Sequence, residues 1–234
     1  MDESVLRPHE DLTAIGDGLF LIQKKKGWRF SEDSIALTDF FLEGRSGKEP
    51  GELSKREKKE KILEIGTGNG AIPLLLYKKG ALSPMTAVEI QEDLTLLARR
   101  NMRMNGISDR VEIIRADIRS YGEGNRWDCI LANPPYLTTD GKKTGDSEER
   151  AAARHELKLT AEEFVAACKR LLKPVGKLYF VHRTYRFPEL ASLLLRFGLF
   201  PKRAKFLQAR SRKESGIVLI EAWKGKQGKF YVES

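Results

Sequence analysis

The fold is decided by residues 61–70, KILEIGTGNG, which join a short apolar run to a turn with glycine at alternate positions. The apolar run predicts a buried strand, and the residues that follow, Ala71 to Lys79, have helical periodicity. Glycine permits positive φ and lets the backbone approach a ligand closely at the carboxyl end of a strand. The stretch therefore predicts a strand, a ligand-binding turn and a helix in succession.

Short apolar runs and helical stretches alternate along the rest of the chain, with Gln91 to Asn105 and Ala161 to Leu172 as clear helices. Such alternation predicts βαβ units around a parallel sheet. The last two runs have only a turn-rich segment between them, so we expect them to pair as an antiparallel hairpin. The predicted fold is a doubly wound α/β domain with a seven-stranded, mostly parallel sheet, and its strands are residues 61–65, 86–90, 111–115, 127–132, 176–182, 200–208 and 217–223.

Two segments precede this core. Residues 11–30 hold short apolar runs around Gly16-Asp17-Gly18, which predicts a hairpin, and Ser31 is expected to cap a helix that runs to about Leu42. Gly, Pro, Ser, Lys and Glu dominate the residues that follow, which indicates a linker or mobile loop. The predicted domains are an N-terminal lid over 1–43, a charged linker over 44–60 and the main domain over 61–234.

Composition indicates a globular protein, because 41% of the 234 residues are hydrophobic. The net charge of +9 suggests that part of the surface meets an anionic partner, although a solvated charged surface is the alternative. Cys129 and Cys168 are predicted to be small core residues rather than a disulfide framework. Residues 1–4 lack the pattern of a signal peptide, and no apolar stretch reaches the ~18 residues of a membrane span. We therefore expect a cytoplasmic protein without membrane segments.

The sequence indicates a binding site for a planar amino group at Asn133-Pro134-Pro135-Tyr136, directly after the apolar run Cys129 to Ala132. Two successive prolines force a stiff bend, which leaves the Asn133 amide and a nearby carbonyl free to point at one spot. Both oxygens accept hydrogen bonds from amino protons, and the Tyr136 ring offers a face for stacking. An ordinary strand-ending turn is the alternative for the tetrapeptide taken alone.

Acidic residues end three successive predicted strands. Glu64 precedes the glycine turn, Glu89 ends the second strand and Asp117 follows the third. A carboxylate at the turn would repel a pyrophosphate but attracts an ammonium group, as in the methionine half of S-adenosylmethionine. Glu89 can accept ribose hydroxyls, and Asp117 can accept the amino protons of adenine. Each acid alone is typical of a helix start, whereas the three together predict a nucleoside cofactor beside the amino-group pocket.

These motifs resemble those of the class I S-adenosylmethionine-dependent methyltransferases, in the branch that methylates amino nitrogens. The segments at 23–33, 153–156, 208–210 and 216–222 are similar to the bacterial tRNA1(Val) adenine-37 N6-methyltransferases. This resemblance implies S-adenosyl-L-methionine as the cofactor, adenine N6 of an RNA, with tRNA favoured, as the substrate, and no metal. It also implies that Phe30 helps to cover the cofactor. The predicted cofactor-binding residues are Phe30, Glu64, Gly66, Thr67, Gly68, Asn69, Gly70, Glu89, Ile90, Asp117, Ile118 and Asn133, and the predicted catalytic residues are Asn133, Pro134, Pro135 and Tyr136.

The lone pair of an adenine amino group is delocalised into the ring, so the nitrogen is a poor nucleophile. With the Asn133 oxygen and the Pro134 carbonyl holding its protons, the lone pair can turn toward the sulfonium methyl, and positioning supplies most of the catalysis. The base must leave its stack, and stacking on Tyr136 is worth about 1–3 kcal/mol. Phosphates can be held by the basic residues Lys24, Lys25, Lys26, Lys202, Arg203, Lys205, Arg210, Arg212 and Lys213, for which a solvated face is the alternative.

Other functions remain compatible with the sequence. The same turn suits the side-chain amide of glutamine, as in the release-factor glutamine methyltransferases, and adenine in ribosomal RNA or DNA is a further possibility. A non-catalytic RNA-binding protein is disfavoured by the intact acceptors. Arg154-His155-Glu156 is interpreted as a positioning segment or as a plain surface loop, because the reaction does not require an acid or base there.

Overall fold

A computed structural model describes residues 6–26, 29–45, 60–134, 159–208 and 216–233. Several predicted features lie outside these ranges: Pro135, Tyr136, most of the 44–60 linker, Arg154-His155-Glu156, and the basic residues Arg210, Arg212 and Lys213. The helices and strands, in chain order, are β1 (Glu10–Gly16), β2 (Leu19–Lys24), α1 (Glu32–Glu43), β3 (Ile62–Ile65), α2 (Ala71–Lys78), β4 (Met85–Glu89), α3 (Glu92–Met104), β5 (Val111–Arg115), β6 (Trp127–Ala132), α5 (Ala161–Leu171), β7 (Leu172–Arg183), η2 (Thr184–Arg186), α6 (Phe187–Arg196), β8 (Leu199–Leu207), β9 (Ile217–Lys224) and β10 (Tyr231–Glu233).

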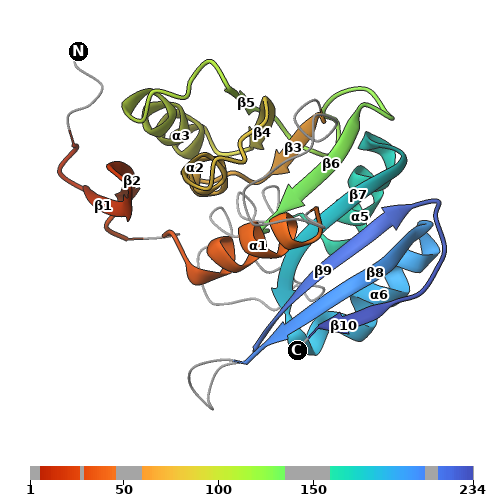
Figure 1. Ribbon diagram of the computed structural model, residues 1–234. Coiled ribbons are helices and arrows are strands. Elements are labelled where there is room, and N and C mark those ends of the chain that lie inside the picture. The colour runs from red at the N-terminus through yellow and green to blue at the C-terminus, as the bar shows by residue number, and fades with distance from the viewer. Residues whose placement is uncertain (1–5, 27–28, 46–59, 135–158, 209–215, 234) are drawn as a thin grey trace, which may run out of the picture.

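The central sheet has the strand order β10-β8-β9-β7-β6-β3-β4-β5 (Figure 1). Strands β7, β6, β3, β4 and β5 are parallel, and β9 is antiparallel to both β7 and β8. The predicted doubly wound α/β sheet and its antiparallel C-terminal hairpin are therefore confirmed. The prediction of seven strands was wrong, because β10 adds an eighth strand that pairs in parallel with β8. A strand of three residues after a polar segment is too short to show alternating hydrophobicity.

Helices cover both faces of the sheet, and each face has its own core. Leu37 of α1, Ile72 of α2 and Met102 of α3 belong to one cluster of buried side chains, whereas Phe164 of α5 and Leu190 of α6 belong to the other. The predicted burial of both cysteines is confirmed, and both are free thiols. No helix among the described residues is long and apolar enough to cross a membrane.

The predicted N-terminal hairpin is confirmed as β1 and β2, which lie beside α3 in Figure 1. Asn101 of α3 and its C-cap residue Asn105 each form hydrogen bonds with the backbone of one residue of β2. Asn101 accepts from the Ile22 N–H at 2.7 Å and donates to the Ile22 carbonyl at 2.9 Å. Asn105 makes the same two bonds with Phe20, at 3.0 and 2.8 Å. The hairpin is thereby attached to the main domain through its backbone.

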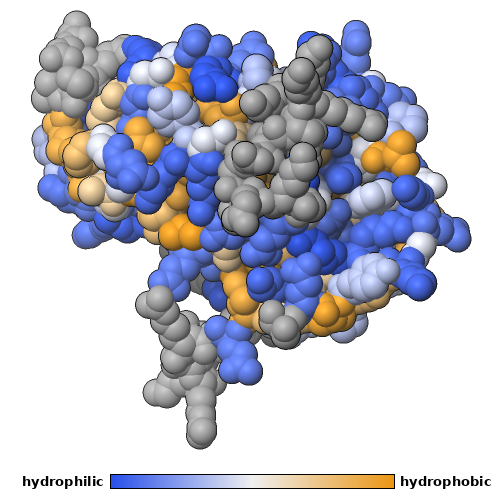
Figure 2. Space-filling model, in the orientation of Figure 1, coloured by the Kyte–Doolittle hydropathy of each residue, from blue (hydrophilic) through white to orange (hydrophobic). Residues whose placement is uncertain are grey.

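Helix α1 connects the hairpin to the sheet. Ser31 is its N-cap residue, as predicted, but its side chain makes no capping bond. Instead the Ser31 carbonyl accepts from the Ser34 N–H at 3.1 Å. The visible surface in Figure 2 is largely hydrophilic, with scattered apolar side chains. The hairpin contributes two of the exposed apolar residues, Leu12 and Phe20, which are 45% and 40% exposed.

Candidate active site

The register of the sheet aligns the predicted site residues along one edge. Ile65 of β3 is level with Val88 of β4 and with Ala132 of β6. The residue after each of these, Gly66, Glu89 and Asn133, therefore begins the same carboxyl edge. The chain runs from β3 outward to β4 and β5 and then returns to β6 on the other side of β3, so this edge is a topological switch point, where α/β sheets bind ligands.

The glycine turn has the predicted backbone geometry. Gly66, Gly68 and Gly70 have φ of 73°, 59° and 82°, in the left-handed region that only glycine adopts readily. A Cβ on Gly66 or Gly68 would meet no atom within 4 Å, whereas one on Gly70 would lie 2.6 Å from the Met102 Cε. The first two glycines therefore leave open space beside the turn, and the third allows α3 to pack closely.

Glu64 lies beneath the turn and is 1% exposed. Its Oε2 accepts a hydrogen bond of 2.6 Å from the Thr67 hydroxyl. Burial raises the pKa of Glu64 to about 8, and the neighbouring charge of Glu89 adds to the rise. Glu64 is therefore protonated at neutral pH in the free protein, whereas the sequence pattern suggested a carboxylate. A cationic ligand nearby would favour its ionised form.

Glu89, the last residue of β4, connects this strand to the glycine turn through hydrogen bonds. The carboxylate is 5% exposed and accepts from the Gly68 N–H and the Gln91 N–H, each at 3.0 Å. A carboxylate offers about four lone-pair positions, so two such bonds leave acceptor capacity for hydroxyl groups. Ile90, half-buried, follows Glu89 at this edge.

Asn69 joins the turn to α3 and to the hairpin. Its carbonyl accepts a bond of 2.8 Å from Asn101 Nδ2, the same amide that holds Ile22. The Asn69 Nδ2 is buried and has no hydrogen-bond partner within the described part of the chain. A buried amide donor of this kind is costly to leave unsatisfied, which makes Asn69 a donor available to a bound anionic group.

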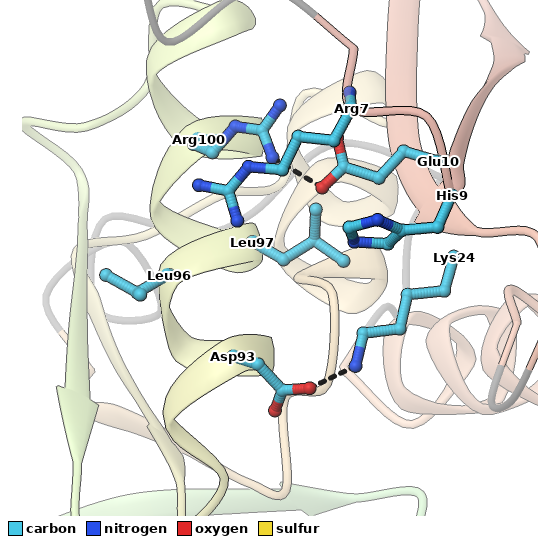
Figure 3. Close-up of a pocket in the computed structure, with 8 residues that line it drawn as sticks. All are labelled: Arg7, His9, Glu10, Lys24, Asp93, Leu96, Leu97 and Arg100. Atoms are coloured by element: carbon cyan, nitrogen blue, oxygen red, sulfur yellow. Dashed lines mark hydrogen bonds and ion pairs between the residues drawn. The ribbon is translucent and has the colours of Figure 1, made fainter. Parts of the chain in front are cut away.

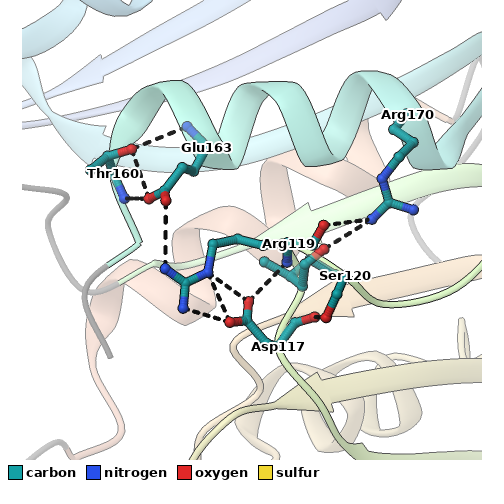
Figure 4. Close-up of polar contacts among 7 residues, drawn as sticks. Asp117, Arg119, Ser120, Thr160, Glu163 and Arg170 are labelled. Carbon is teal, nitrogen blue, oxygen red and sulfur yellow. Dashed lines mark hydrogen bonds and ion pairs between the residues drawn. The ribbon is translucent and has the colours of Figure 1, made fainter. Parts of the chain in front are cut away.

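Asp117 reaches the same edge but is paired with Arg119 (Figure 4). The Arg119 Nε donates to both carboxylate oxygens, at 3.0 and 2.8 Å, and its backbone N–H donates to Oδ1 at 2.9 Å. These bonds lower the pKa of Asp117 and keep it ionised. The Arg119 guanidinium also lies 3.5 Å from Glu163, which forms a capping box with Thr160 at the start of α5.

The loop that carries Asp117 and Ile118 is fixed by Arg170 of α5. Its guanidinium donates to the carbonyls of Ile118, Tyr121 and Gly122, at 3.1, 2.9 and 2.8 Å. Figure 4 shows Arg170 approaching from the opposite end of α5 to Thr160. Ile118 itself is 6% exposed and packs in the core beneath the loop.

The Asn133 amide is half-buried at the end of β6, and Pro134 after it is buried. Asn133 Nδ2 donates to the Ser34 hydroxyl of α1 at 3.0 Å. Phe30 is partly buried against the same core as α1, and its N–H donates to the Gln23 side chain at 3.0 Å. The N-terminal segment therefore contacts one of the predicted catalytic residues directly.

A separate pocket of about 140 Å³ lies between the hairpin and α3 (Figure 3). Its lining includes Glu10, whose carboxylate forms a buried ion pair with Arg100 at 2.6 Å. Lys24 pairs with Asp93 at the other end of the pocket. His9 is exposed at its mouth. None of the predicted catalytic or cofactor-binding residues lines this pocket, whereas Lys24, one of the predicted phosphate-binding residues, does.

The predicted phosphate-binding residues have different environments. Arg203 pairs with Glu221 at 2.9 Å and with Glu233 at 3.0 Å, and its side chain is only 12% exposed. Lys205 lies 3.6 Å from Glu43. The Arg203 guanidinium also donates to the Phe40 carbonyl of α1 at 2.5 Å, so this residue joins α1, β9 and β10. Among the described residues, no group of three or more His, Cys, Asp or Glu side chains could hold a metal ion.

Four residues of the site were missed from the sequence: Ser34, Asn101, Arg119 and Arg170. Only Arg119 carried a local signal, because it lies two positions after the predicted acceptor Asp117. The others act across long separations, which reach 99 positions for Ser34 and Asn133. Ser34 and Asn101 resemble ordinary helix residues in the sequence, and only the packing of α1 and α3 reveals their contacts.

The parallel sheet, the glycine turn and the aligned acidic strand ends together define a class I, Rossmann-like methyltransferase fold. The model of the methyltransferase small domain family matches residues 51–197, and the chain belongs to this family of methyltransferases. It is similar to the tRNA1(Val) (adenine(37)-N6)-methyltransferase of Trichodesmium erythraeum, with 33% identity over 174 residues, 71% of each chain. The enzyme of the same name from Aeromonas hydrophila is 31% identical over 74% of this chain and 75% of its own.

Solved structures support the fold. P. horikoshii TYW2, solved in complex with MeSAdo, gives a TM-score of 0.62 at 13% identity, covering 93% of this chain and 72% of its own. A SAM-dependent methyltransferase from Aquifex aeolicus gives a TM-score of 0.54 at 18% identity, covering 82% of this chain and 93% of its own.

Proposed function

We propose that the protein uses S-adenosyl-L-methionine to methylate the N6 amino group of adenine in RNA, with adenine 37 of a valine tRNA as the favoured target. The observation that carries this proposal is the Asn133 amide, held by Ser34 at the edge where the glycine turn and Glu89 meet. The names of the relatives, which specify that nucleoside in tRNA, give the proposal its substrate.

The residues at this edge fit the cofactor chemically. The unpartnered Asn69 Nδ2 suits the methionine carboxylate, and Glu64, once ionised, suits its ammonium group. Glu89 retains lone pairs for the ribose hydroxyls, and Asp117 is the proposed acceptor for the adenine amino group. The open space beside Gly66 allows close approach of a ligand. When bound, S-adenosylmethionine supplies an electrophilic methyl group on a sulfonium centre.

The roles of the protein residues follow from the same geometry. The Asn133 oxygen and the Pro134 carbonyl accept the two protons of the target amino group, which orients its lone pair. Tyr136, outside the described residues, is proposed to stack on the extruded base. We further propose that residues 1–43 and the domain of residues 61–234 together form one active site.

The test is incubation with labelled S-adenosylmethionine and separate pools of tRNA, ribosomal RNA, DNA and release factor, followed by nucleoside or amino-acid analysis. The proposal expects N6-methyladenosine in the tRNA pool. Label as methylglutamine in the release factor would support the protein-methyltransferase alternative. Label in ribosomal RNA or DNA would identify that nucleic acid as the substrate in place of tRNA. Cofactor binding without label in any pool would contradict catalysis.

A further inference from the structure

Within the described part of the chain, the side-chain amide of Asn133 is hydrogen-bonded to the N-terminal segment. Asn133 Nδ2 donates to the Ser34 Oγ at 3.0 Å, and Ser34 lies in the first turn of α1. Ser34 is only 7% exposed, so water competes poorly for this bond. In this arrangement the Ser34 oxygen accepts from the donor end of the amide, and Oδ1 is the end left available to a ligand.

The direction of this amide decides whether it can bind an amino group. An amide carries an acceptor at one end and donors at the other, whereas an exocyclic amino group offers only donors to the edge of the pocket. If the Asn133 side-chain amide were flipped, its N–H donors would face the N–H donors of the amino group, and no hydrogen bond could form. We propose that Ser34 is a positioning residue, which holds Asn133 with its oxygen toward the target amino group. This inference rests on the proposed function of Asn133.

The position of Ser34 is itself tightly constrained. One turn further along α1, the Thr38 hydroxyl donates to the Ser34 carbonyl at 2.8 Å. Phe41 of the same helix packs edge-on against Tyr179 of β7, with ring centroids 5.0 Å apart. Phe41 and Tyr179 are each 1% exposed or less. The helix is thus anchored on the sheet, and the hydroxyl of Ser34 has a fixed place relative to β6. The N-terminal segment supplies part of the reaction geometry, in addition to any covering role.

Ser34→Ala tests the proposal with whichever substrate pool the wild-type protein labels. Loss of one net hydrogen bond predicts a kcat lower by about 2- to 13-fold, with KM and the cofactor dissociation constant nearly unchanged. Ser34→Thr, which keeps a hydroxyl, should restore most of the rate. Thr86→Val is the control, because it removes a buried hydroxyl of β4 that bonds Glu112 and contacts neither Ser34 nor Asn133, and it should keep the wild-type kcat.

An Asn133→Asp background separates orientation from a general structural effect. A carboxylate has two equivalent oxygens, so it presents an acceptor whichever way it turns. Adding Ser34→Ala to Asn133→Asp should therefore change kcat by less than about 2-fold relative to Asn133→Asp alone. The positioning role is overturned if Ser34→Ala keeps the wild-type kcat, or if it lowers kcat equally in both backgrounds. A wild-type protein that labels no RNA but labels release factor would refute the proposed substrate, and the same variants would still test the positioning role.

Discussion

Asn101→Ala should destabilise the protein strongly, because this one side chain joins the hairpin, α3 and the glycine turn. Asn101 is 0% exposed and makes three bonds, with the Ile22 N–H, the Ile22 carbonyl and the Asn69 carbonyl, at 2.7, 2.9 and 2.8 Å. At about 0.5–1.5 kcal/mol for each net bond, the free energy of unfolding should fall by roughly 1.5–4.5 kcal/mol. For a domain of this size, each kcal/mol corresponds to about 2–4 °C in Tm.

Asn105→Ala provides the matched control. It is the C-cap residue of the same helix and pairs with Phe20 in the same way, but its bonds to Phe20 are exposed. Its Nδ2 also donates to the Asn101 carbonyl, at 2.8 Å. Water can replace those bonds, so the free energy of unfolding should fall by less than about 1 kcal/mol. Urea denaturation followed by circular dichroism measures both variants. Titration calorimetry should show weaker cofactor binding for Asn101→Ala but not for Asn105→Ala, because of these two residues Asn101 is the one that donates to the Asn69 carbonyl. Equal destabilisation by the two variants would refute the reasoning.

Three further predictions concern charge and chemistry. Asn133→Ala should lower kcat by at least about 10²-fold, with calorimetric cofactor affinity retained, because the acceptor acts on the target amino group; near-normal turnover would contradict this. Cofactor affinity should rise with pH toward about 8 as Glu64 ionises, and Glu64→Gln should flatten that dependence. Arg100→Met should cost about 3–5 kcal/mol in chemical denaturation by leaving Glu10 buried and unpaired, and Glu10→Gln in the same protein should recover part of it.

The same property of Glu64 affects stability. Its pKa in the folded state, about 8, lies above the ordinary value of 4.5, so between these pH values the folded protein holds a proton that the unfolded chain has released. The contribution of this group to the free energy of unfolding therefore falls as pH rises from about 4.5 to about 8. Denaturation midpoints of the wild type, measured across this range, should fall more than those of Glu64→Gln. Parallel curves for the two proteins would contradict the burial effect.

Local sequence patterns predicted the elements that depend on short-range rules. The glycine turn after Ile65, with positive φ at Gly66, followed from residue type, and the strand ends at Glu89 and Asn133 followed from alternating apolar runs. Strand β10 was missed because three residues carry no periodicity.

Polar contacts between distant segments could not be predicted. The bond from Asn133 to Ser34 and the three bonds of Asn101 exist only because α1 and α3 pack where they do. The charge state of Glu64 likewise depends on complete burial, which the apolar run around it suggests but does not quantify. The residue types of a site are therefore more accessible from sequence than its hydrogen-bond directions and protonation states.

The most direct test of the central claim is mass-spectrometric nucleoside analysis of tRNA after incubation with the purified protein and S-adenosylmethionine. The account predicts that N6-methyladenosine accumulates with time and that the methyl group maps to adenine 37 of a valine tRNA. Active protein that binds the cofactor, yet leaves every adenine of the tRNA pool unmethylated, would contradict it.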